Sequence, residues 1–253
     1  MCTVRDIMKK AICIAITAAL VVAFSFALVA CNDSSGPTTA DITDNDIIQL
    51  RAVLSVSSGY SSYGRDITKT SGTGDNQVTE HTVVSVYTNG SRQNTVDIET
   101  EVSANGTVTT TYIHAGMNSA EELVYASAVY EDGVLVSTPV YNHGSEGTKN
   151  IGIVIGESGA LEALNNLLNI IGETSYFTTS GTITSYDNGS TVYTINYSDE
   201  TNSGTATVTV SGGVITQIVF AANDETFTTG YTYDLGRKAP LSESEWNELH
   251  PAE

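Results

Sequence analysis

The chain has few cysteines, and all of them lie near its start. They are Cys2, Cys13 and Cys31, so no thiol occurs in the long segment that follows. That segment can form no disulfide, no thiolate metal cluster and no cysteine nucleophile. It must be stabilised by its hydrophobic core, and it is long enough to bury a substantial one.

Positive charge is also scarce. After residue 30 the sequence has seven Lys or Arg against 28 Asp or Glu, a net charge of −21. A surface this acidic repels the phosphates of nucleic acids and anionic lipid head groups. We therefore expect no nucleic-acid partner, and we interpret the acidity as a source of solubility.

Local catalytic and metal-binding patterns are lacking as well. A nucleophile elbow has one residue between its serine and its second glycine. The stretch Gly156-Glu157-Ser158-Gly159 lacks that residue, so we place Ser158 near a helix N-cap instead. The four histidines give no local metal pair. We expect no metal, no cofactor other than a covalent lipid, and no enzymatic activity; a hydrolase assembled from distant residues is the weaker alternative. The histidines are His81, His114, His143 and His250.

The first 31 residues have the layout of an export signal. Three basic residues precede the uncharged, almost wholly apolar run 11–30, which ends in Leu28-Val29-Ala30-Cys31. This resembles the signal peptide and lipobox of bacterial lipoproteins, in which the chain is cut before the cysteine and that residue carries the lipid. The resemblance implies a signal peptide over residues 1–30, a lipid on Cys31 that attaches the protein to the membrane, and a location on the outer face of the cytoplasmic membrane or in the cell envelope.

Two other interpretations of this segment remain open. An apolar run of about 20 residues can span a bilayer as an uncleaved helix, or the signal is cleaved and the cysteine is incidental. Residues 31–41 are polar and contain Gly36 and Pro37. They predict a flexible tether that holds the domain about 15–20 Å from its anchor, and residues 42–253 form that domain.

Helical spacing of apolar residues predicts two amphipathic helices. The first spans residues 44–56 and begins with a capping box formed by Thr43 and Asp46. The second spans residues 158–172, with Gly172 as its C-cap. Its apolar stripe consists of Leu161, Leu164, Leu168 and Ile171.

Alternation with a period of two predicts about five strands from Val78 onwards and about five more from Ser175. Turn dipeptides separate them: Asn89-Gly90, Asn105-Gly106, Asp132-Gly133, Asn188-Gly189 and Gly212-Gly213. Runs of strands with segregated helices indicate an α+β fold. We favour one curved antiparallel sheet of about ten strands, with both helices over one face, above two tandem domains, because no linker separates the halves. Residues 241–249, with Trp246, predict a short helix or loop that packs back on the sheet.

The order of elements over residues 42–240, with the two final strands at 214–220 and 231–236, resembles the LolA-like lipoprotein carriers and the related LppX/LprG-type glycolipid carriers. The resemblance implies a half-barrel whose space between sheet and helices holds acyl chains. The chain would then bind or carry a hydrophobic or amphipathic ligand, and Leu161, Leu164, Leu168 and Ile171 would line that space or pack as plain core. The alternative is a cell-surface interaction module without a cavity. The chain has 13 tyrosines. Such a module would use those that are exposed to bind a protein or glycan partner.

Overall fold

The computed structural model describes residues 36–72, 77–88, 94–118, 120–147, 159–173, 178–198, 203–223 and 225–251. The predicted signal peptide, Cys31, the Asn89-Gly90 turn and Ser158 lie outside the described residues.

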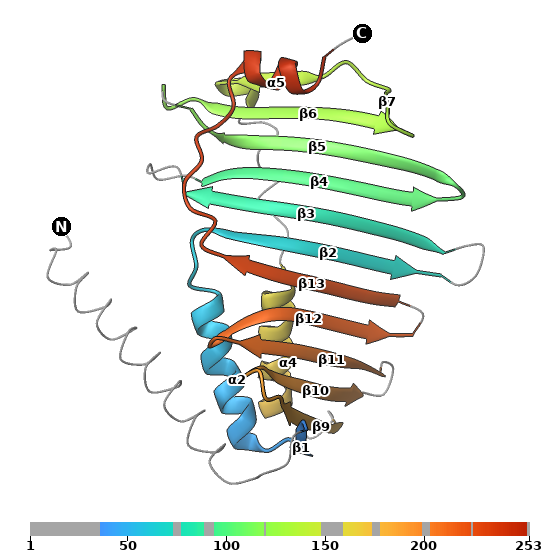
Figure 1. Ribbon diagram of the computed structural model, residues 1–253, viewed down its shortest axis with the longest axis vertical. Helices are drawn as coiled ribbons and strands as arrows, with labels where there is room; N and C mark the ends of the chain where they lie inside the picture. Colours follow the sequence, from blue (N-terminus) through green and yellow to red (C-terminus); the bar gives the residue numbers. More distant parts are fainter. Residues whose placement is uncertain are drawn as a thin grey trace, which may run out of the picture.

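The fold is α+β and is built on one open antiparallel sheet to which thirteen strands contribute (Figure 1). The order across the sheet is β1-β9-β10-β11-β12-β13-β2-β3-β4-β5-β6-β7, and β8 pairs with β6. The described strands therefore form one sheet, as we favoured, and not two separate sheets. The strands before β2 in this order are β1 (Thr38–Asp41), β9 (Thr178–Ser185), β10 (Thr191–Ser198), β11 (Ser203–Ser211), β12 (Val214–Ala222) and β13 (Glu225–Tyr233). The others are β2 (Tyr63–Ser71), β3 (Val78–Thr88), β4 (Asn94–Ala104), β5 (Thr107–Met117), β6 (Leu123–Glu131), β7 (Val134–Leu135) and β8 (Val140–His143).

The strand count exceeds the predicted ten, and the prediction missed one long strand: β2 (Tyr63–Ser71), in the middle of the sheet, precedes Val78, where the predicted strands begin. The other additional strands lie at the edges of the sheet. Strands β1, β7 and β8 have four residues or fewer, too few to show an alternating pattern. Strand β1 also corrects the prediction of the tether, because residues 38–41 pair with β9 instead of extending freely. All four residues of β1 are exposed, so polar composition did not distinguish an edge strand from a linker.

The predicted turns that the structure describes are confirmed. Both central residues have positive φ at Asn105-Gly106 (53° and 81°), at Asp132-Gly133 (48° and 79°) and at Gly212-Gly213 (59° and 79°). This is the geometry of two-residue hairpin turns that match the twist of the strands. Asn188-Gly189 lies in the longer connection between β9 and β10, where Gly189 has a φ of 79°.

Both predicted helices are present. Helix α2 (Asp44–Ser57) begins with the capping box of Thr43 and Asp46. Helix α4 (Ala160–Glu173) continues through Gly172, so the prediction that Gly172 is its C-cap is wrong. Near the chain end, α5 (Glu243–Leu249) begins at Ser242, which forms a second capping box with Glu245.

The helices cover opposite faces of the sheet. Pairing places Tyr231 of β13 on the same face as Arg65, Val84 and Ile98 of the next three strands, because directly opposite residues share a face. Asp97 precedes Ile98 and so points to the other face, where it contacts the C-terminal segment. Figure 1 shows α2 and α4 beside β9–β13 and α5 beside β6. The two predicted helices therefore do share a face, but they cover only part of it.

Two apolar clusters correspond to these two coverings. The larger lies between α2, α4 and strands β10–β13. It includes Leu50, Val53, Leu54, Ala160, Leu164, Leu167, Leu168, Tyr193, Ile195, Ala206, Val208, Ile215, Ile218 and Tyr231. The smaller joins Trp246 of α5 to Ala126 and Ala128 of β6. Tyrosines pack in or against both clusters, which supports the interpretation that many of them serve as core residues.

Candidate functional site

A cavity of about 590 Å³ lies where α2 and α4 meet strands β2 and β13. This is the space between sheet and helices in which the sequence predicted a ligand. Side chains from all four elements and from the turn after α2 line it. They include Arg51, Leu54, Ser57, Tyr60, Tyr63, Arg65, Leu161, Glu162, Asn165, Tyr231 and Tyr233.

One wall of the cavity is aromatic. Because side chains alternate along a strand, Tyr231 and Tyr233 point to the same face of β13, and their rings stack with centroids 6.1 Å apart and planes 9° apart. Tyr60 packs on Tyr233 at a centroid distance of 4.6 Å. The hydroxyl of Tyr233 donates to the carbonyl oxygen of Ile215 at 2.7 Å. The wall is therefore fixed in place on the sheet.

A buried serine joins α2 to the sheet beside this wall. The Ser57 hydroxyl donates to the Val53 carbonyl at 2.9 Å and accepts from the Ile215 N–H at 2.9 Å. Both bonds are buried, so the serine satisfies a backbone donor of β12 that would otherwise lack a partner.

Two arginines bring positive charge to the cavity. The guanidinium of Arg51 donates to the carbonyl oxygen of Leu168 near the end of α4. The guanidinium carbon of Arg65 lies 5.8 Å from the centre of the Tyr63 ring. Nε of Arg65 is buried and has no hydrogen-bond partner, and the same is true of the Tyr231 hydroxyl.

Burial changes the ionisation of the aromatic wall. It raises the pKa of the Tyr231 hydroxyl far above its ordinary value, and the charge of Arg65 offsets only part of this rise. Burial also raises the pKa of Tyr233, against a smaller lowering by the nearby Ser57 hydroxyl. Both hydroxyls are therefore neutral hydrogen-bonding groups around neutral pH.

The four residues of the predicted α4 stripe are divided between cavity and core. Leu161 lines the cavity. Leu164 and Leu168 are completely buried in the larger cluster, and Ile171 packs against that cluster. Sequence reasoning missed the arginines and tyrosines that line the cavity. The one available signal was that Arg51 and Arg65 are two of only seven basic residues after residue 30.

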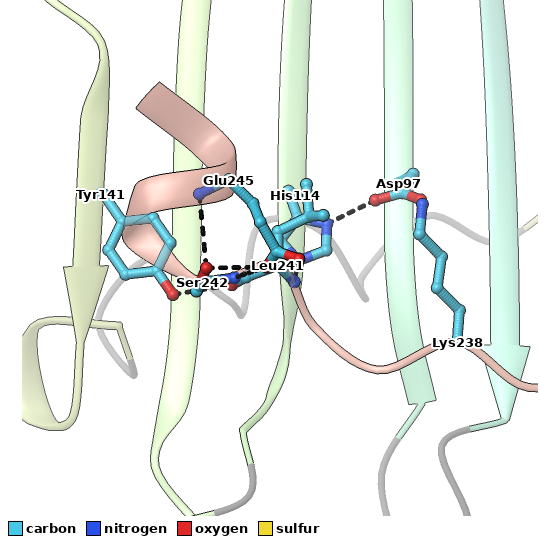
Figure 2. Close-up of polar contacts among 7 residues, drawn as sticks. All are labelled: Asp97, His114, Tyr141, Lys238, Leu241, Ser242 and Glu245. Atoms are coloured by element: carbon cyan, nitrogen blue, oxygen red, sulfur yellow. Dashed lines mark hydrogen bonds and ion pairs between the residues drawn. The ribbon is translucent and has the colours of Figure 1, made fainter. Parts of the chain in front are cut away.

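A second polar cluster lies on the opposite face, at Asp97, His114 and Lys238 (Figure 2). Nδ1 of His114 lies 2.5 Å from Oδ1 of Asp97, and Nζ of Lys238 lies 2.5 Å from Oδ2. Nε2 of His114 accepts from the backbone N–H of Leu241 at 2.8 Å. Because a backbone N–H can only donate, the proton of His114 is on Nδ1 and is donated to Asp97.

This arrangement holds the chain end rather than performing catalysis. An Asp–His pair orients the base of a catalytic triad only if Nε2 is free to accept a proton from a hydroxyl, and here the N–H of Leu241 occupies that atom. Burial alone would raise the pKa of Asp97, but the hydrogen bonds and charges of His114 and Lys238 outweigh it, so this pKa is lowered. We call residues 238–250 the C-terminal clasp.

The rest of the clasp is mostly apolar and aromatic. Trp246 is buried over β6, and its ring lies 4.2 Å from that of His250. Nδ1 of His250 is 2.9 Å from the Tyr130 hydroxyl, and burial lowers the pKa of this histidine. The hydroxyl of Tyr141 donates to the Leu241 carbonyl at 2.8 Å.

The two remaining histidines pair with surface carboxylates. His81 contacts Asp66 at 2.9 Å, and His143 lies 3.7 Å from Glu122. Within the described ranges, no group of three or more His, Cys, Asp or Glu side chains could hold a metal ion. The described helices are also too short or too polar to cross a membrane.

Comparisons with known proteins provide little guidance. No protein-family model matches the chain, and no curated protein matches it. Among solved structures, a DUF1329 family protein from Desulfovibrio piger aligns with 80% of this chain and 96% of its own, at 11% sequence identity and a TM-score of 0.28. A similarity this low supports no inference about function.

Proposed function

We propose that the chain is a lipid-anchored extracytoplasmic protein that binds or carries a hydrophobic or amphipathic small molecule. The observation that carries the proposal is the 590 Å³ cavity between α2, α4, β2 and β13. Its volume lies within the range of about 300–1,000 Å³ that is typical of small-molecule sites. The proposal includes the half-barrel arrangement of the LolA-like carriers and assigns no enzymatic activity.

The lining of the cavity suits a ligand with an apolar body. Leu54 and Leu161 supply aliphatic surface from the two helices, and the tyrosines supply aromatic surface from the sheet. Most small-molecule sites have such a lining with a few polar groups that orient the ligand. Leu164 and Leu168 of the same helix are fully buried in the larger cluster, so α4 is held on the sheet independently of the cavity.

Labelling with a photoreactive lipid analogue tests the proposal. The full chain, reconstituted in nanodiscs of neutral lipid, is irradiated with a hexadecanol that carries a diazirine. We expect the labelled peptides to come from residues 51–65, 159–165 and 231–233. Leu161→Trp fills the cavity and should remove most of this label. Ala163→Trp, at an exposed position on the same helix, should keep it. Labelling that is spread over the surface, or equal in the two variants, would disprove the cavity as a ligand site.

The anchor needs a separate test. Replacement of Cys31 by Ala should abolish incorporation of labelled fatty acid and release the protein from the membrane fraction. A Cys31→Ala protein that stays in the membrane would support the uncleaved transmembrane helix instead.

The alternative of a surface interaction module has less support. It requires tyrosines gathered on the surface, whereas Tyr231 and Tyr233 at the cavity and the tyrosines beneath the clasp pack in or against the apolar clusters. Tyr60 and Tyr186 are exposed.

A further inference from the structure

We propose that the ligand carries an anionic head group, a carboxylate or a phosphate, which binds against Arg65, Tyr231 and the first turn of α4. This inference rests on the proposed function and specifies the class of ligand. The apolar body of such a molecule would extend along Leu54 and Leu161.

The first observation is that Arg65 has no counter-ion among the residues that the structure describes. Its guanidinium forms no ion pair or hydrogen bond with the described residues, and Nε is buried. The adjacent carboxylate cannot supply one, because Asp66 points to the other face of β2 and pairs with His81. Glu162, the acidic residue among the described side chains that line the cavity, is exposed and forms no ion pair with Arg65. A buried charged N–H without an acceptor is costly, so an acceptor supplied by a ligand would be favourable at Nε.

The second observation concerns the residue directly opposite. Tyr231 pairs with Arg65 across the β13–β2 register, its side chain is only 8% exposed, and its hydroxyl has no hydrogen-bond partner. The backbone of Leu161 is near enough to lower the pKa of this hydroxyl slightly but forms no hydrogen bond with it. The hydroxyl hydrogen is therefore left without an acceptor, beside a guanidinium that also lacks one.

The third observation is the position of α4. The helix begins at Ala160, so the positive end of its dipole points at the same place. Gly159, just before it, allows a close approach, because a Cβ at this position would lie 2.7 Å from Nη1 of Arg65. A guanidinium and a helix N-terminus repel each other unless an anion lies between them.

Three kinds of donor thus converge, and no described acceptor lies among them. A carboxylate or phosphate has enough acceptor sites for all three and a charge that offsets the guanidinium, whereas an alcohol oxygen accepts at most two hydrogen bonds without such a charge, and a hydrocarbon accepts none. The strongly acidic domain repels small free anions. Retention of an anion here therefore requires additional binding energy, and the apolar wall of the cavity supplies it. The ligand class that meets both conditions is an amphipathic anion.

A pair of probes tests this assignment on the full chain in neutral-lipid nanodiscs. The probes have the same diazirine-bearing hexadecyl chain and end in either a carboxylate or an alcohol. We expect the carboxylate probe to label the cavity at lower concentration than the alcohol does. Arg65→Gln should raise the concentration of carboxylate probe needed for half-maximal labelling about tenfold, since a hydrogen bond to a charged group contributes about 1.5–3 kcal/mol. Labelling by the alcohol should change less than about twofold.

Matched variants separate the role of Arg65 from general charge and from folding. Lys69→Gln makes the same charge change at an exposed position on the same strand and should leave both probes unaffected. Tyr231→Phe should raise the concentration of carboxylate probe needed for half-maximal labelling a few-fold, because it removes one neutral donor. Circular dichroism and thermal unfolding show whether each variant is folded. The comparison of the two probes on the unmodified chain tests the preference for a carboxylate even if a variant fails to fold.

The outcomes also separate this inference from the proposed function. If neither probe labels the cavity, the proposed function fails. If both label it equally and Arg65→Gln changes neither, the cavity binds ligands but the anionic head group is disproved. If inorganic phosphate competes as strongly as hexadecyl phosphate, the site binds a free anion and the amphipathic ligand is disproved.

Discussion

The two halves of the sheet are covered in opposite ways. On one side of the β13–β2 pairing, α2 and α4 lie over β9–β13 and bury a large apolar cluster. On the other side, the C-terminal clasp lies over β4–β6 on the reverse face. Its contacts combine a small aromatic cluster with the polar group of Asp97, His114 and Lys238.

This difference indicates what each half depends on. Apolar burial is insensitive to protonation, whereas hydrogen bonds to a carboxylate are present only while the carboxylate is ionised. The helix-covered half should therefore respond mainly to changes in side-chain volume. The half beneath the clasp should respond also to pH. The cavity lies beneath α2 and α4, at the border between the two halves, and its described walls include no residue of the clasp.

The largest effect should come from the core beneath the cavity. Leu164→Ala removes a completely buried side chain and should lower the free energy of unfolding by about 4 kcal/mol, through lost burial and the cavity left behind. Urea denaturation measures this loss. Ile170→Ala, on the same helix at a side chain that is 42% exposed, should change it by less than about 0.5 kcal/mol. Equal losses in the two variants would contradict the packing described for α4.

A somewhat smaller effect is expected for the clasp. Trp246→Ala should lower the free energy of unfolding by about 3 kcal/mol, which is towards the low end for a buried tryptophan. The loss is moderated because the buried indole N–H lacks a partner, so its removal is favourable. Hydrogen exchange should show the loss of protection confined to α5 and β4–β6. Leu249→Ala, at a side chain that is 61% exposed, is the control. A loss of protection that extends to α2 and α4 would show that the two halves are more closely coupled than we propose.

The polar group of the clasp should make stability depend on pH. Asp97→Asn should cost about 2 kcal/mol at neutral pH, since it removes hydrogen bonds to a charged group. The folded-state pKa of Asp97 is lowered, so its contribution is present above the ordinary aspartate pKa of about 3.9 and disappears as the pH falls below it. The difference between the original chain and the variant should therefore shrink below about pH 4 in urea titrations. Asp66→Asn, at an exposed carboxylate, should leave the pH profile unchanged, and a similar change in both variants would count against the clasp.

The smallest effects should come from the two capping boxes, one in each half. Thr43→Ala and Ser242→Ala should each cost about 1 kcal/mol, because each leaves a backbone N–H at a helix start without its acceptor. Thr43→Ser and Ser242→Thr keep that acceptor and should recover most of the stability. Exchange measurements should place the first loss in α2 and the second in the clasp. A Ser242→Ala protein with full protection of α5 would show that packing of Trp246 alone holds the helix.

Much of the fold could be predicted from the sequence because it depends on local patterns. The capping box of α2, the apolar stripe of α4 and the hairpin turn at Asn105-Gly106 each involve residues within a few positions of one another. The short strands at the sheet edges could not be predicted, because their pairing with a neighbour, and not their own composition, defines them. The face that each helix covers was also beyond prediction in detail, since it depends on the order of strands in the sheet.

The candidate site divides in the same way. Leu161 could be placed in the space between helix and sheet because helical spacing gives its direction. Arg65 and Tyr231 stand 166 positions apart and meet only through the pairing of β2 with β13. No local pattern links them, so their unsatisfied donors become visible only when the register is known.

The β13–β2 pairing also has a consequence for the order of folding. The hairpins within each half join residues that are close in the chain and can form within microseconds. The β13–β2 pairing joins the two ends of the folded domain, and such non-local contacts form slowly. Since β2 supplies Tyr63 and Arg65 while β13 supplies Tyr231 and Tyr233, neither half contains a complete cavity. A nascent or partly folded chain therefore lacks the complete cavity, so under the proposed function a ligand can be loaded only after this pairing has formed.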